Sequence, residues 1–383
     1  MDSHYDIAII GMGCAGSHIV QELLRRKTDL NIVIIDDFKA ASLDKTWSFW
    51  EKGKGKWDHL ISHSWKKGSY IMPDDFIPLD LDPYVYKTVE SRDFIAFAKA
   101  ELQQNPNFTL IEEKVNNVEY DDEKGHNKKI HINYSTGTLS ASIVLDSRID
   151  QKFFQDTKAT TLQQHFKGWV IKTEQPTFDL EVFTMMDYRL RDAGTTSFTY
   201  VLPYSTTEAL VEFTYFSKDV VSDDTYERYL KEYITNYLNL TNYSIEKTEQ
   251  GVIPMTSYKF EQHHRKNHLK IGTAGGWVKP STGYSFKMSE KKAAQLVDNI
   301  ILKRELTHGM ISKKFRFYDD IMLDVLHSDN ARGPEVFHTL YRKNKIQTIF
   351  SFLDQETSLS QELGIMLPMT SAPFLSAFFK KLF

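Results

Sequence analysis

The chain has 383 residues, of which 41% are hydrophobic and 26% charged, and a formal net charge of −4. This composition excludes a disordered protein, and the length favours two domains of unequal size. The weakly acidic charge gives no reason to expect nucleic acid as a partner. The only cysteine, Cys14, excludes an intrachain disulfide and suits a reducing, cytoplasmic compartment.

The N-terminal residues lead almost directly into an apolar stretch, so we expect no signal peptide. No uncharged apolar run reaches the roughly 20 residues that a membrane-spanning helix needs. We therefore expect a soluble or peripheral protein.

A βαβ unit is predicted at the start of the chain. Residues 5–10 are apolar, as in a buried parallel strand, a helix is expected over residues 17–26, and a second strand over residues 31–35. The glycines between strand and helix allow a pyrophosphate to approach the helix N-terminus, and an acid about 20 residues further on suits a ribose hydroxyl. Cys14 is expected to be a small packing residue. The predicted dinucleotide-binding residues are Gly11, Gly13, Ala15, Gly16 and Asp36.

A second glycine-rich turn lies far along the chain, at residues 272–286, and contains Gly275, Gly276 and Gly283. Two close-approach loops suggest one long ligand held at two points, as flavoproteins of the hydroxylase kind hold FAD. We expect the first loop at the diphosphate and the second near the isoalloxazine ring.

The fold class expected is α/β, with a Rossmann-like FAD-binding domain, a β-sheet substrate domain and a helical C-terminus. The segments between the two glycine loops alternate between nucleotide-binding and β-rich patterns, so both domains should be discontinuous. The expected division is residues 1–50, 88–168 and 250–300 for the FAD-binding domain, 51–87 and 169–249 for the substrate-binding sheet, and 301–383 for the helical region.

Two further patterns have competing interpretations. His263, His264 and His268 could suggest a metal, but their charged neighbours indicate a solvated turn, so no metal is expected. Near the end, apolar residues recur at helical spacing beside two lysines, which suits either a membrane-surface helix or a helix that covers the core. These apolar residues are Phe374, Leu375, Phe378, Phe379, Leu382 and Phe383.

The order of short motifs along almost the whole chain resembles the lycopene cyclase family, the bacterial flavoproteins that cyclise carotenoids. Thr46-Trp47-Ser48-Phe49 is similar to the family's TWSF element, and Phe198-Thr199-Tyr200-Val201-Leu202-Pro203 to its FxYxLP strand. Residues 210–214 stand where the family has its acidic IEDT or LEET motif, and residues 272–286 resemble GGxVHPSTGYS. Other matches are Thr88-Val89-Glu90-Ser91-Arg92-Asp93-Phe94, Gln164-His165-Phe166-Lys167-Gly168, Met186-Asp187-Tyr188-Arg189 and Gly251-Val252-Ile253-Pro254.

The resemblance implies a lycopene β-cyclase, which converts the open ψ end groups of lycopene to β-rings, giving γ- or β-carotene without net oxidation. An alkene is protonated, an internal double bond attacks the carbocation, and a proton leaves. The resemblance also implies reduced FAD as cofactor and NADPH as its reductant. The carotenoid substrate resides in lipid, so we expect the protein to attach peripherally to the inner face of the cell membrane.

Glu212 is the residue implied as the proton donor. It alternates with Leu210 and Thr214 on one face of a strand, and burial of that face would raise its pKa. Without the resemblance to the family, the alternative interpretation is that Glu212 is a strand residue that faces solvent. Aromatic side chains are expected to line the substrate pocket and to stabilise the cation. These are Tyr188, Phe198, Tyr200, Phe213 and Tyr258.

Two residues depart from the family pattern. The family's second acid is Phe213 here, which predicts that a pair of carboxylates is missing at this position. The family's histidine before the proline is Lys279, which predicts a changed contact to flavin or substrate.

Other classes of function fit part of the pattern. A flavin-dependent hydroxylase or halogenase typically carries an acid in the late loop, where this chain has Thr273. A non-catalytic carotenoid-binding relative would keep the fold without the acid chemistry. Mono- and bicyclic products, and different ring isomers, are all compatible with these residues.

Overall fold

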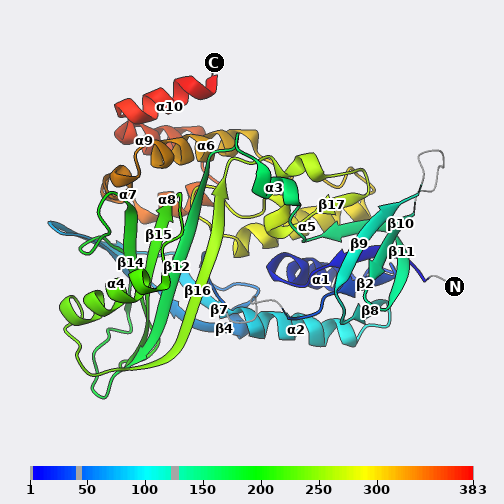
Figure 1. Cartoon of the computed structure of the whole chain (residues 1–383), viewed down its shortest axis with the longest axis horizontal. Helices are drawn as coiled ribbons and strands as arrows, with labels where there is room; N and C mark the ends of the chain where they lie inside the picture. Colours follow the sequence, from blue (N-terminus) through cyan, green and yellow to red (C-terminus); the bar gives the residue numbers. More distant parts are fainter. Residues whose placement is uncertain (1–2, 40–44, 122–128, 383) are drawn as a thin grey trace.

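A computed structural model describes residues 3–39, 45–121 and 129–382 (Figure 1). The described chain forms two seven-stranded sheets, a three-stranded sheet and a group of helices at the C-terminal end. The expected α/β fold class is confirmed.

The first sheet carries the predicted βαβ unit. Its parallel strands are apolar on both faces, because Ile7 and Ile9 of β1 face helices while Ala8 and Ile10 face the opposite layer. Strand β17 (His268–Lys270) joins the second half of β11. The strand order is β8 (Phe108–Ile111), β2 (Ile32–Ile35), β1 (His4–Ile10), β11 (Gly137–Asp146), β10 (Ile130–Tyr134) and β9 (Val115–Tyr120).

The two faces of this sheet pack differently. On one face, side chains of the antiparallel strands β9 and β10, which continue the sheet beyond β11, pack with those of the parallel strands. Helices cover the other through aliphatic side chains such as Leu23, Leu102 and Leu296. These helices are α1 (Cys14–Arg26), α2 (Ser91–Gln103) and α5 (Phe286–Ile301).

The second sheet is antiparallel except where β13 pairs with β5. Helix α4 (Asp223–Asn236) packs on one face of it, at the left of Figure 1. The expected domain boundaries near residues 168 and 250 fall inside β12 and β16, which both continue through them. The strand order is β16 (Ser244–Thr256), β12 (Thr161–Lys172), β15 (Glu208–Ser217), β14 (Thr196–Pro203), β13 (Val182–Asp187), β5 (Lys67–Met72) and β6 (Asp75–Asp80).

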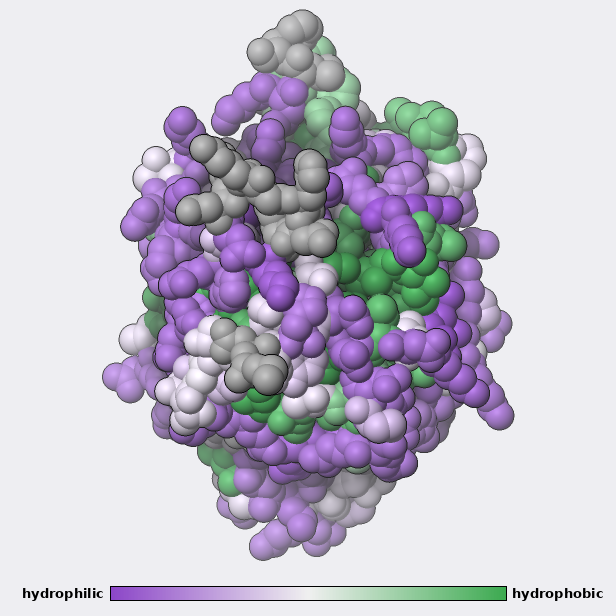
Figure 2. Space-filling view, turned by 90° about the vertical axis from the view of Figure 1, so that its right-hand side faces the viewer, coloured by the Kyte–Doolittle hydropathy of each residue, from purple (hydrophilic) through white to green (hydrophobic). Residues whose placement is uncertain are grey.

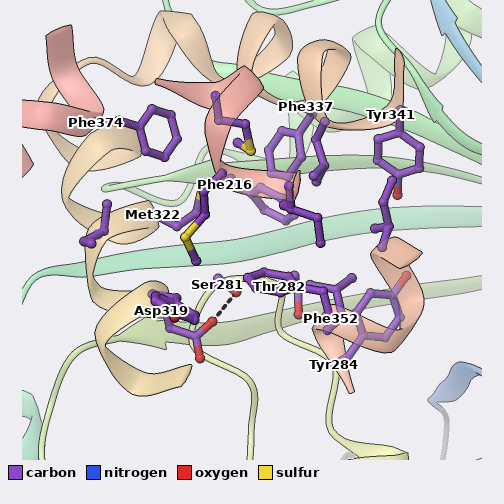
Figure 3. Close-up of a pocket in the computed structure, with 18 of the residues that line it drawn as sticks. Phe216, Ser281, Thr282, Tyr284, Asp319, Met322, Phe337, Tyr341, Phe352 and Phe374 are labelled. Atoms are coloured by element: carbon purple, nitrogen blue, oxygen red, sulfur yellow. Dashed lines mark hydrogen bonds between the residues drawn. The ribbon is translucent and has the colours of Figure 1, made fainter. Parts of the chain in front are cut away.

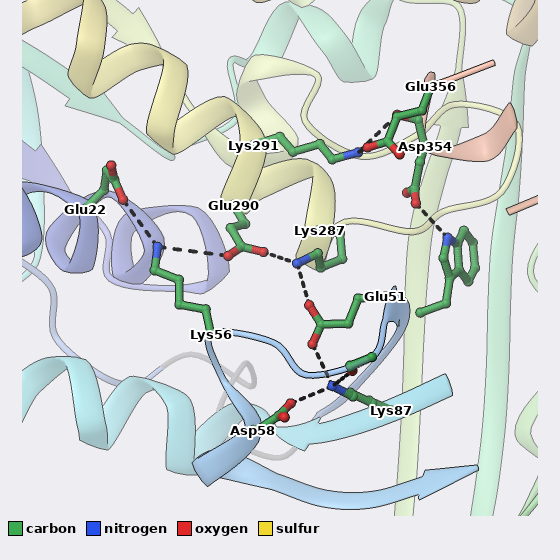
Figure 4. Close-up of polar contacts among 12 residues, drawn as sticks. Glu22, Glu51, Lys56, Asp58, Lys87, Lys287, Glu290, Lys291, Asp354 and Glu356 are labelled. Atoms are coloured by element: carbon green, nitrogen blue, oxygen red, sulfur yellow. Dashed lines mark hydrogen bonds and ion pairs between the residues drawn. The ribbon is translucent and has the colours of Figure 1, made fainter. Parts of the chain in front are cut away.

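The three-stranded sheet is tied to the helices by ion pairs (Figure 4). It consists of β3 (Thr46–Lys52), β7 (Tyr84–Glu90) and β4 (Ile61–Trp65). The buried Lys87 Nζ lies 2.9 Å from Glu51 Oε1, and Lys287 of α5 lies 3.0 Å from Glu51 Oε2. Loss of one partner would leave a charge uncompensated, so these pairs fix β3 and β7 against α5.

The region predicted to be helical is helical. Helix α10 packs on α6 at the top of Figure 1. Among the described residues, no helix combines the length and apolarity required to cross a membrane. The helices are α6 (Lys313–Ser328), α7 (Gly333–Lys343), α8 (Ile346–Leu353), α9 (Leu359–Met369) and α10 (Ala372–Leu382), and a one-turn helix, α3 (Gln151–Gln155), precedes β12.

Candidate active site

The glycine loop between β1 and α1 has the backbone geometry of a nucleotide site. Gly11 has a φ of +92°, which side chains disfavour. A Cβ on Gly16 would lie 2.1 Å from the Gly11 carbonyl oxygen, so glycine lets α1 begin directly against β1. A Cβ on Gly13 would meet no described atom within 4 Å, which shows that Gly13 borders open space.

The N-terminus of α1 suits an anion. Within the described chain no side chain caps it, and its first turn holds no acidic residue, so its backbone N–H groups remain available. Asp36, at the end of β2, accepts hydrogen bonds from the backbone N–H of Met12 at 2.5 Å and of Phe38 at 2.6 Å. The predicted acid therefore lies beside the glycine loop. Burial raises the pKa of the Cys14 thiol to about 12, so this thiol stays protonated, as a packing residue would.

A cavity of about 390 Å³, the cofactor cavity, opens in front of this loop. The early and late glycine loops both line it, as expected for a ligand held at two points. Ser147, which follows β11, also borders it. The lining residues are Gly13, Cys14, Ala15, Gly16, Lys45, Thr46, Trp47, Ser147, Ile149, Phe166, Glu249, Gln250, Gly251, Val252, Ile253, Pro254, Gly272, Thr273, Trp277, Val278, Ser285 and Ser289.

The late turn reaches the cofactor cavity through residues other than those predicted. Among the described residues, the lining includes Gly272 and Thr273 but not Gly275 or Gly276. A Cβ on Gly275 would lie 2.2 Å from the Lys270 carbonyl oxygen, and Gly276, with a φ of +66°, faces a phenylalanine ring. These two glycines shape the turn by close packing. Gly283, with a φ of +73°, borders the next cavity instead.

That next cavity, of about 110 Å³, is the central cavity and contains Glu212. It shares one set of lining residues with the cofactor cavity and another with a third cavity, so the three cavities adjoin one another in a row. Thr46, Trp47, Phe166, Glu249, Ile253 and Ser285 line both the cofactor and the central cavities. Tyr200, Thr282 and Tyr284 line both the central cavity and the third one.

Two carboxylates flank one glycine in the central cavity. Gly168 of β12 is paired with Glu212 of β15 on one side and with Glu249 of β16 on the other. Residues paired across neighbouring strands point to the same face, so both carboxylates lie on the face that lines the cavity. A Cβ at residue 168 would lie 3.3 Å from Glu212 Cγ and 2.9 Å from Leu210 Cδ1, so glycine makes room for these two side chains against β12.

Burial sets the protonation of this pair. Burial raises the pKa of Glu212 to about 8, the charge of Glu249 adds to the increase, and a hydrogen bond from the Thr214 hydroxyl at 2.9 Å opposes it. Burial likewise raises the pKa of Glu249 to about 7, against the opposing charge of Lys247 and a hydrogen bond from Thr46. Two close carboxyl groups removed from water share a proton more readily than both ionise.

Position 213 supplies no carboxylate, as predicted, but a second acid reaches the cavity from elsewhere. Phe213 points to the opposite face of the sheet and stacks on Tyr229 of α4, with ring centroids 4.7 Å apart. The second acid comes from a different strand, β16. Leu210 and Thr214 are buried on the same face as Glu212, and Glu212 itself is half-buried where it lines the cavity. The upward direction of its pKa shift agrees with the expectation.

The third cavity, of about 370 Å³, is the apolar cavity (Figure 3). It runs from Tyr284 and Thr282 to the C-terminal helices. Its few polar side chains include Ser281 and Asp319, which hydrogen-bond to each other at 2.6 Å. Apolar lining residues from several elements include Phe216, Met322, Phe337, Phe352, Leu363, Leu367, Phe374, Leu375 and Phe378.

Tyrosines mark the junction between the central and apolar cavities. The Tyr284 hydroxyl lies 3.3 Å from that of Tyr86 and 3.4 Å from that of Tyr200. The Trp50 ring packs edge-on against Tyr284 with centroids 4.6 Å apart. Aromatic faces at this junction can stabilise a cation formed beside Glu212.

Comparison with known proteins places the chain in a family. The family model described as lycopene cyclase protein matches residues 6–378. The chain belongs to the lycopene cyclase family. It is 23% identical over 306 residues to a lycopene beta-cyclase of Pantoea ananas, covering 77% of this chain and 75% of that protein. It is 24% identical over 307 residues to a lycopene beta-cyclase of Pseudescherichia vulneris, covering 77% of this chain and 74% of that one.

Solved structures show the same fold at low sequence identity. A geranylgeranyl bacteriochlorophyll reductase-like protein from Thermoplasma acidophilum superposes with a TM-score of 0.59 at 12% identity, covering 99% of this chain and 96% of that one. A halogenase mutant in complex with FAD gives a TM-score of 0.61 at 12% identity, covering 98% and 90%. This lycopene cyclase family member thus shares its fold with these two proteins.

The structure brings one of the five predicted aromatic residues to the cavities of this family member. Tyr200 lines both the central and the apolar cavities. Tyr188 and Phe198 are fully buried in the core, and Phe213 faces α4. Tyr258 lies away from Glu212, where its hydroxyl is 2.6 Å from His263 Nε2. The other four predicted pocket residues are thus placed elsewhere, because alternation assigns residues to a face but not to a cavity.

The structure also shows the surroundings of Lys279 and of the predicted histidine cluster. Lys279 is buried, and its Nζ donates to Asp319 Oδ1 at 2.8 Å, so it anchors the late turn to α6. His268 Nε2 lies 3.2 Å from Asp146, which also pairs with Arg148. Across the described residues, no group of three potential ligands is placed to hold a metal.

The residues that prediction missed are Glu249, Tyr86 and Tyr284. Glu249 lies two residues before Gly251, at the edge of one recognised motif, and Tyr284 lies inside another, the late turn. Their positions at the cavities depend on how distant strands pair.

Proposed function

We propose that this chain is a lycopene β-cyclase that forms β-rings at the open ends of lycopene by proton-initiated, non-redox cyclisation. The observation that carries the proposal is the position of Glu212. A carboxyl group whose pKa is raised to about 8 lies in a small cavity between a nucleotide-type cavity and a long apolar one. A protonated acid next to an apolar channel is what the protonation of an alkene requires.

The reaction proposed here has three steps. Glu212 donates its proton to the terminal double bond, which leaves a tertiary carbocation. The electrons of an internal double bond then form the ring bond and move the positive charge into the ring. Loss of a ring proton creates the new double bond, so one proton enters, one leaves, and no oxidant is consumed. The rings of Tyr200, Tyr284 and Trp50 would stabilise the charge by about 0.5–2 kcal/mol each where well placed.

The cofactor cavity fits FAD. The Gly11 turn, the open space at Gly13 and the uncapped N–H groups of α1 would hold the diphosphate. Asp36, which accepts a hydrogen bond from the Met12 N–H in the glycine loop, would be the ribose ligand. Among the described residues that line the cofactor cavity, Asp36 is not included. Lys45 adds a positive charge at the same cavity. Bound there in its reduced form, with NADPH as the proposed reductant, FAD would supply negative charge near the reacting end of the substrate.

The apolar cavity supports a carotenoid as substrate and a lipid surface as its source. Large exposed hydrophobic residues of α9 and α10 lie at its rim, with Leu363 59% and Leu367 66% exposed. By contrast, the end of the molecule formed by the nucleotide-binding sheet is mainly hydrophilic (Figure 2). Lys380, exposed beside Phe379, suits an anionic headgroup. We propose that the α9–α10 face contacts the inner surface of the cell membrane.

The test is Glu212→Gln in a lycopene-accumulating host, with pigments separated by chromatography. Loss of the proton donor should lower ring formation by at least about 100-fold, with the flavin content of the purified protein unchanged. Glu208→Gln, on the same strand but outside the described cavity linings, is the matched control and should leave ring formation unchanged. Cyclic product at the wild-type rate in Glu212→Gln would refute the assignment.

Oxygen separates the proposal from a hydroxylase or halogenase of the same fold. A cyclase supplied with reduced flavin should turn over under strict anaerobiosis, because its atom balance contains no oxygen. An oxygen requirement, or a product heavier than lycopene, would favour the oxygenase.

A further inference from the structure

The position of Glu249 gives it a part in the chemistry that no sequence motif indicated. Its backbone lies across β12 from Glu212, with Gly168 between them. The side chain is 7% exposed and borders both the cofactor cavity and the central cavity. A buried carboxylate beside a reaction cavity needs a partner or a function.

We propose that Glu249 is the base that removes the ring proton after Glu212 has protonated the open end. The inference rests on the proposed cyclase function and assigns its last step. The geometry supports it because both acids face one cavity from opposite sides of a glycine, so a substrate end held between them can meet one as acid and the other as base.

The surroundings decide which acid starts with the proton. Glu249 accepts a hydrogen bond from the Thr46 hydroxyl at 3.0 Å, and the charge of Lys247, itself 3.1 Å from Glu90, favours its ionised form. Glu212 has the hydrogen bond from Thr214 and faces the negative charge of Glu249. The charge of Glu90 acts in the opposite direction and raises the pKa of Glu249. The larger upward shift of the pKa at Glu212 makes Glu212 the favoured proton donor of the pair.

Other groups that titrate around the pair leave this order unchanged. Burial raises the pKa of the Tyr204 hydroxyl well above its usual range, and the same holds for Tyr200, so both stay neutral. His63 is near Glu90, and burial lowers its pKa, so it is also neutral at pH 7.

The step balances in atoms and electrons. The C–H bond of the ring carbon next to the cation breaks, its electron pair becomes the ring double bond, and the proton passes to a Glu249 oxygen. To complete the cycle, the proton taken up by Glu249 returns to the ionised Glu212, a transfer that the proposal places in the cavity that both residues line. Each ring thus resets the pair without an external acid, oxidant or reductant.

The first test replaces each acid by its amide. Glu249→Gln should lower formation of β-rings by about 100-fold or more, as expected for loss of a general base. It should also change the ratio of β-rings to other ring isomers, because the cation then loses a proton elsewhere. Glu246→Gln, exposed on the same strand, is the control and should match the wild type.

The second test separates a base from a residue that only supports the fold. Glu249→Asp and Glu212→Asp keep the charge but retract the carboxylate. With lycopene deuterated at the ring carbon that loses its proton, Glu249→Asp should show a primary isotope effect that Glu212→Asp lacks. In deuterated solvent, Glu212→Asp should show the larger solvent isotope effect, because this variant slows the protonation step.

The outcomes are distinguishable. If the wild-type protein forms no ring, both the proposed function and the role of Glu249 as a base are refuted. If the wild type forms rings and Glu249→Gln retains both the rate and the ring isomer, only the inference fails. Absence of the substrate isotope effect in a slowed Glu249→Asp would also overturn the role as a base.

Discussion

At the scale of single residues, a buried acid couples folding to pH. Burial raises the pKa of Glu212 from about 4.3 in the unfolded chain to about 8 in the native protein, so the native state holds an extra proton between these values. Stability that is present below the unfolded pKa is therefore lost as the pH rises toward about 8. A functional acid of this kind destabilises the protein near neutral pH.

We expect Glu212→Gln to remove this part of the pH dependence. Urea unfolding from about pH 5 to about pH 8 should show a smaller fall of the midpoint in the variant than in the wild type, since glutamine does not titrate. Glu208→Gln should follow the wild-type curve. Parallel curves for Glu212→Gln and the wild type would contradict a raised pKa at this residue.

Glu212 could be predicted from the sequence, whereas Glu249 could not. Strand alternation and the motif position of Glu212 sufficed to place it on a buried face. Glu249 could not be assigned in the same way, because its position opposite Gly168 depends on the register of β16 against β12. Phe213 could have been excluded, since a residue next to Glu212 in a strand must face the other way.

At the scale of elements, the β1–α1 turn separates two uses of glycine. Gly16→Ala would place a Cβ 2.1 Å from the Gly11 carbonyl oxygen and should lower the free energy of unfolding by about 1–3 kcal/mol. Gly13→Ala meets no such clash within the described structure, but fills space at the cofactor cavity. It should leave the unfolding midpoint near that of the wild type and weaken FAD binding.

Thermal unfolding and flavin fluorescence titration check these two expectations. An equal loss of stability in both variants would show that Gly13 packs in the same way as Gly16. Unchanged FAD affinity in Gly13→Ala would place the diphosphate elsewhere.

Local patterns predicted the elements better than their contacts. The βαβ unit follows from apolar runs and glycine spacing, and the C-terminal helices follow from their periodicity. The late turn was correctly expected near the same cavity as the early one, but Gly275 and Gly276 pack against Lys270 and Phe260. Glycine is required wherever another group packs directly against the backbone. The sequence does not show whether that group belongs to a ligand or to the protein itself.

At the scale of the whole molecule, the exposed apolar face is the feature that a soluble fold alone does not require. Large exposed hydrophobic residues concentrate in α9 and α10, at the rim of the apolar cavity. Phe383 lies outside the described residues, and the side chain of Leu382 is likewise not described, so the expected pattern is seen at Phe374, Leu375, Phe378 and Phe379.

We expect Leu363→Glu combined with Leu367→Glu to weaken binding to vesicles of phosphatidylcholine and phosphatidylglycerol. Each leucine contributes about 1.5–3 kcal/mol when fully buried, so the bound fraction in a sedimentation assay should fall at least about tenfold. The matched control, Leu180→Glu with Val220→Glu, changes exposed apolar residues that do not line the described cavities. Equal binding by both double variants would argue against the α9–α10 face.

The line of cavities has a consequence for the order of events on a symmetric substrate. The apolar cavity extends from Tyr284 toward the C-terminal helices, so we expect a rod-shaped polyene to enter from that side, end first. Its second end then points back toward the lipid while the first reacts. A two-ringed product therefore requires two binding events. Between them, the one-ringed carotene must leave the cavity and enter again with its other end first. Dilution of the membrane phase should then favour the one-ringed carotene over the two-ringed one.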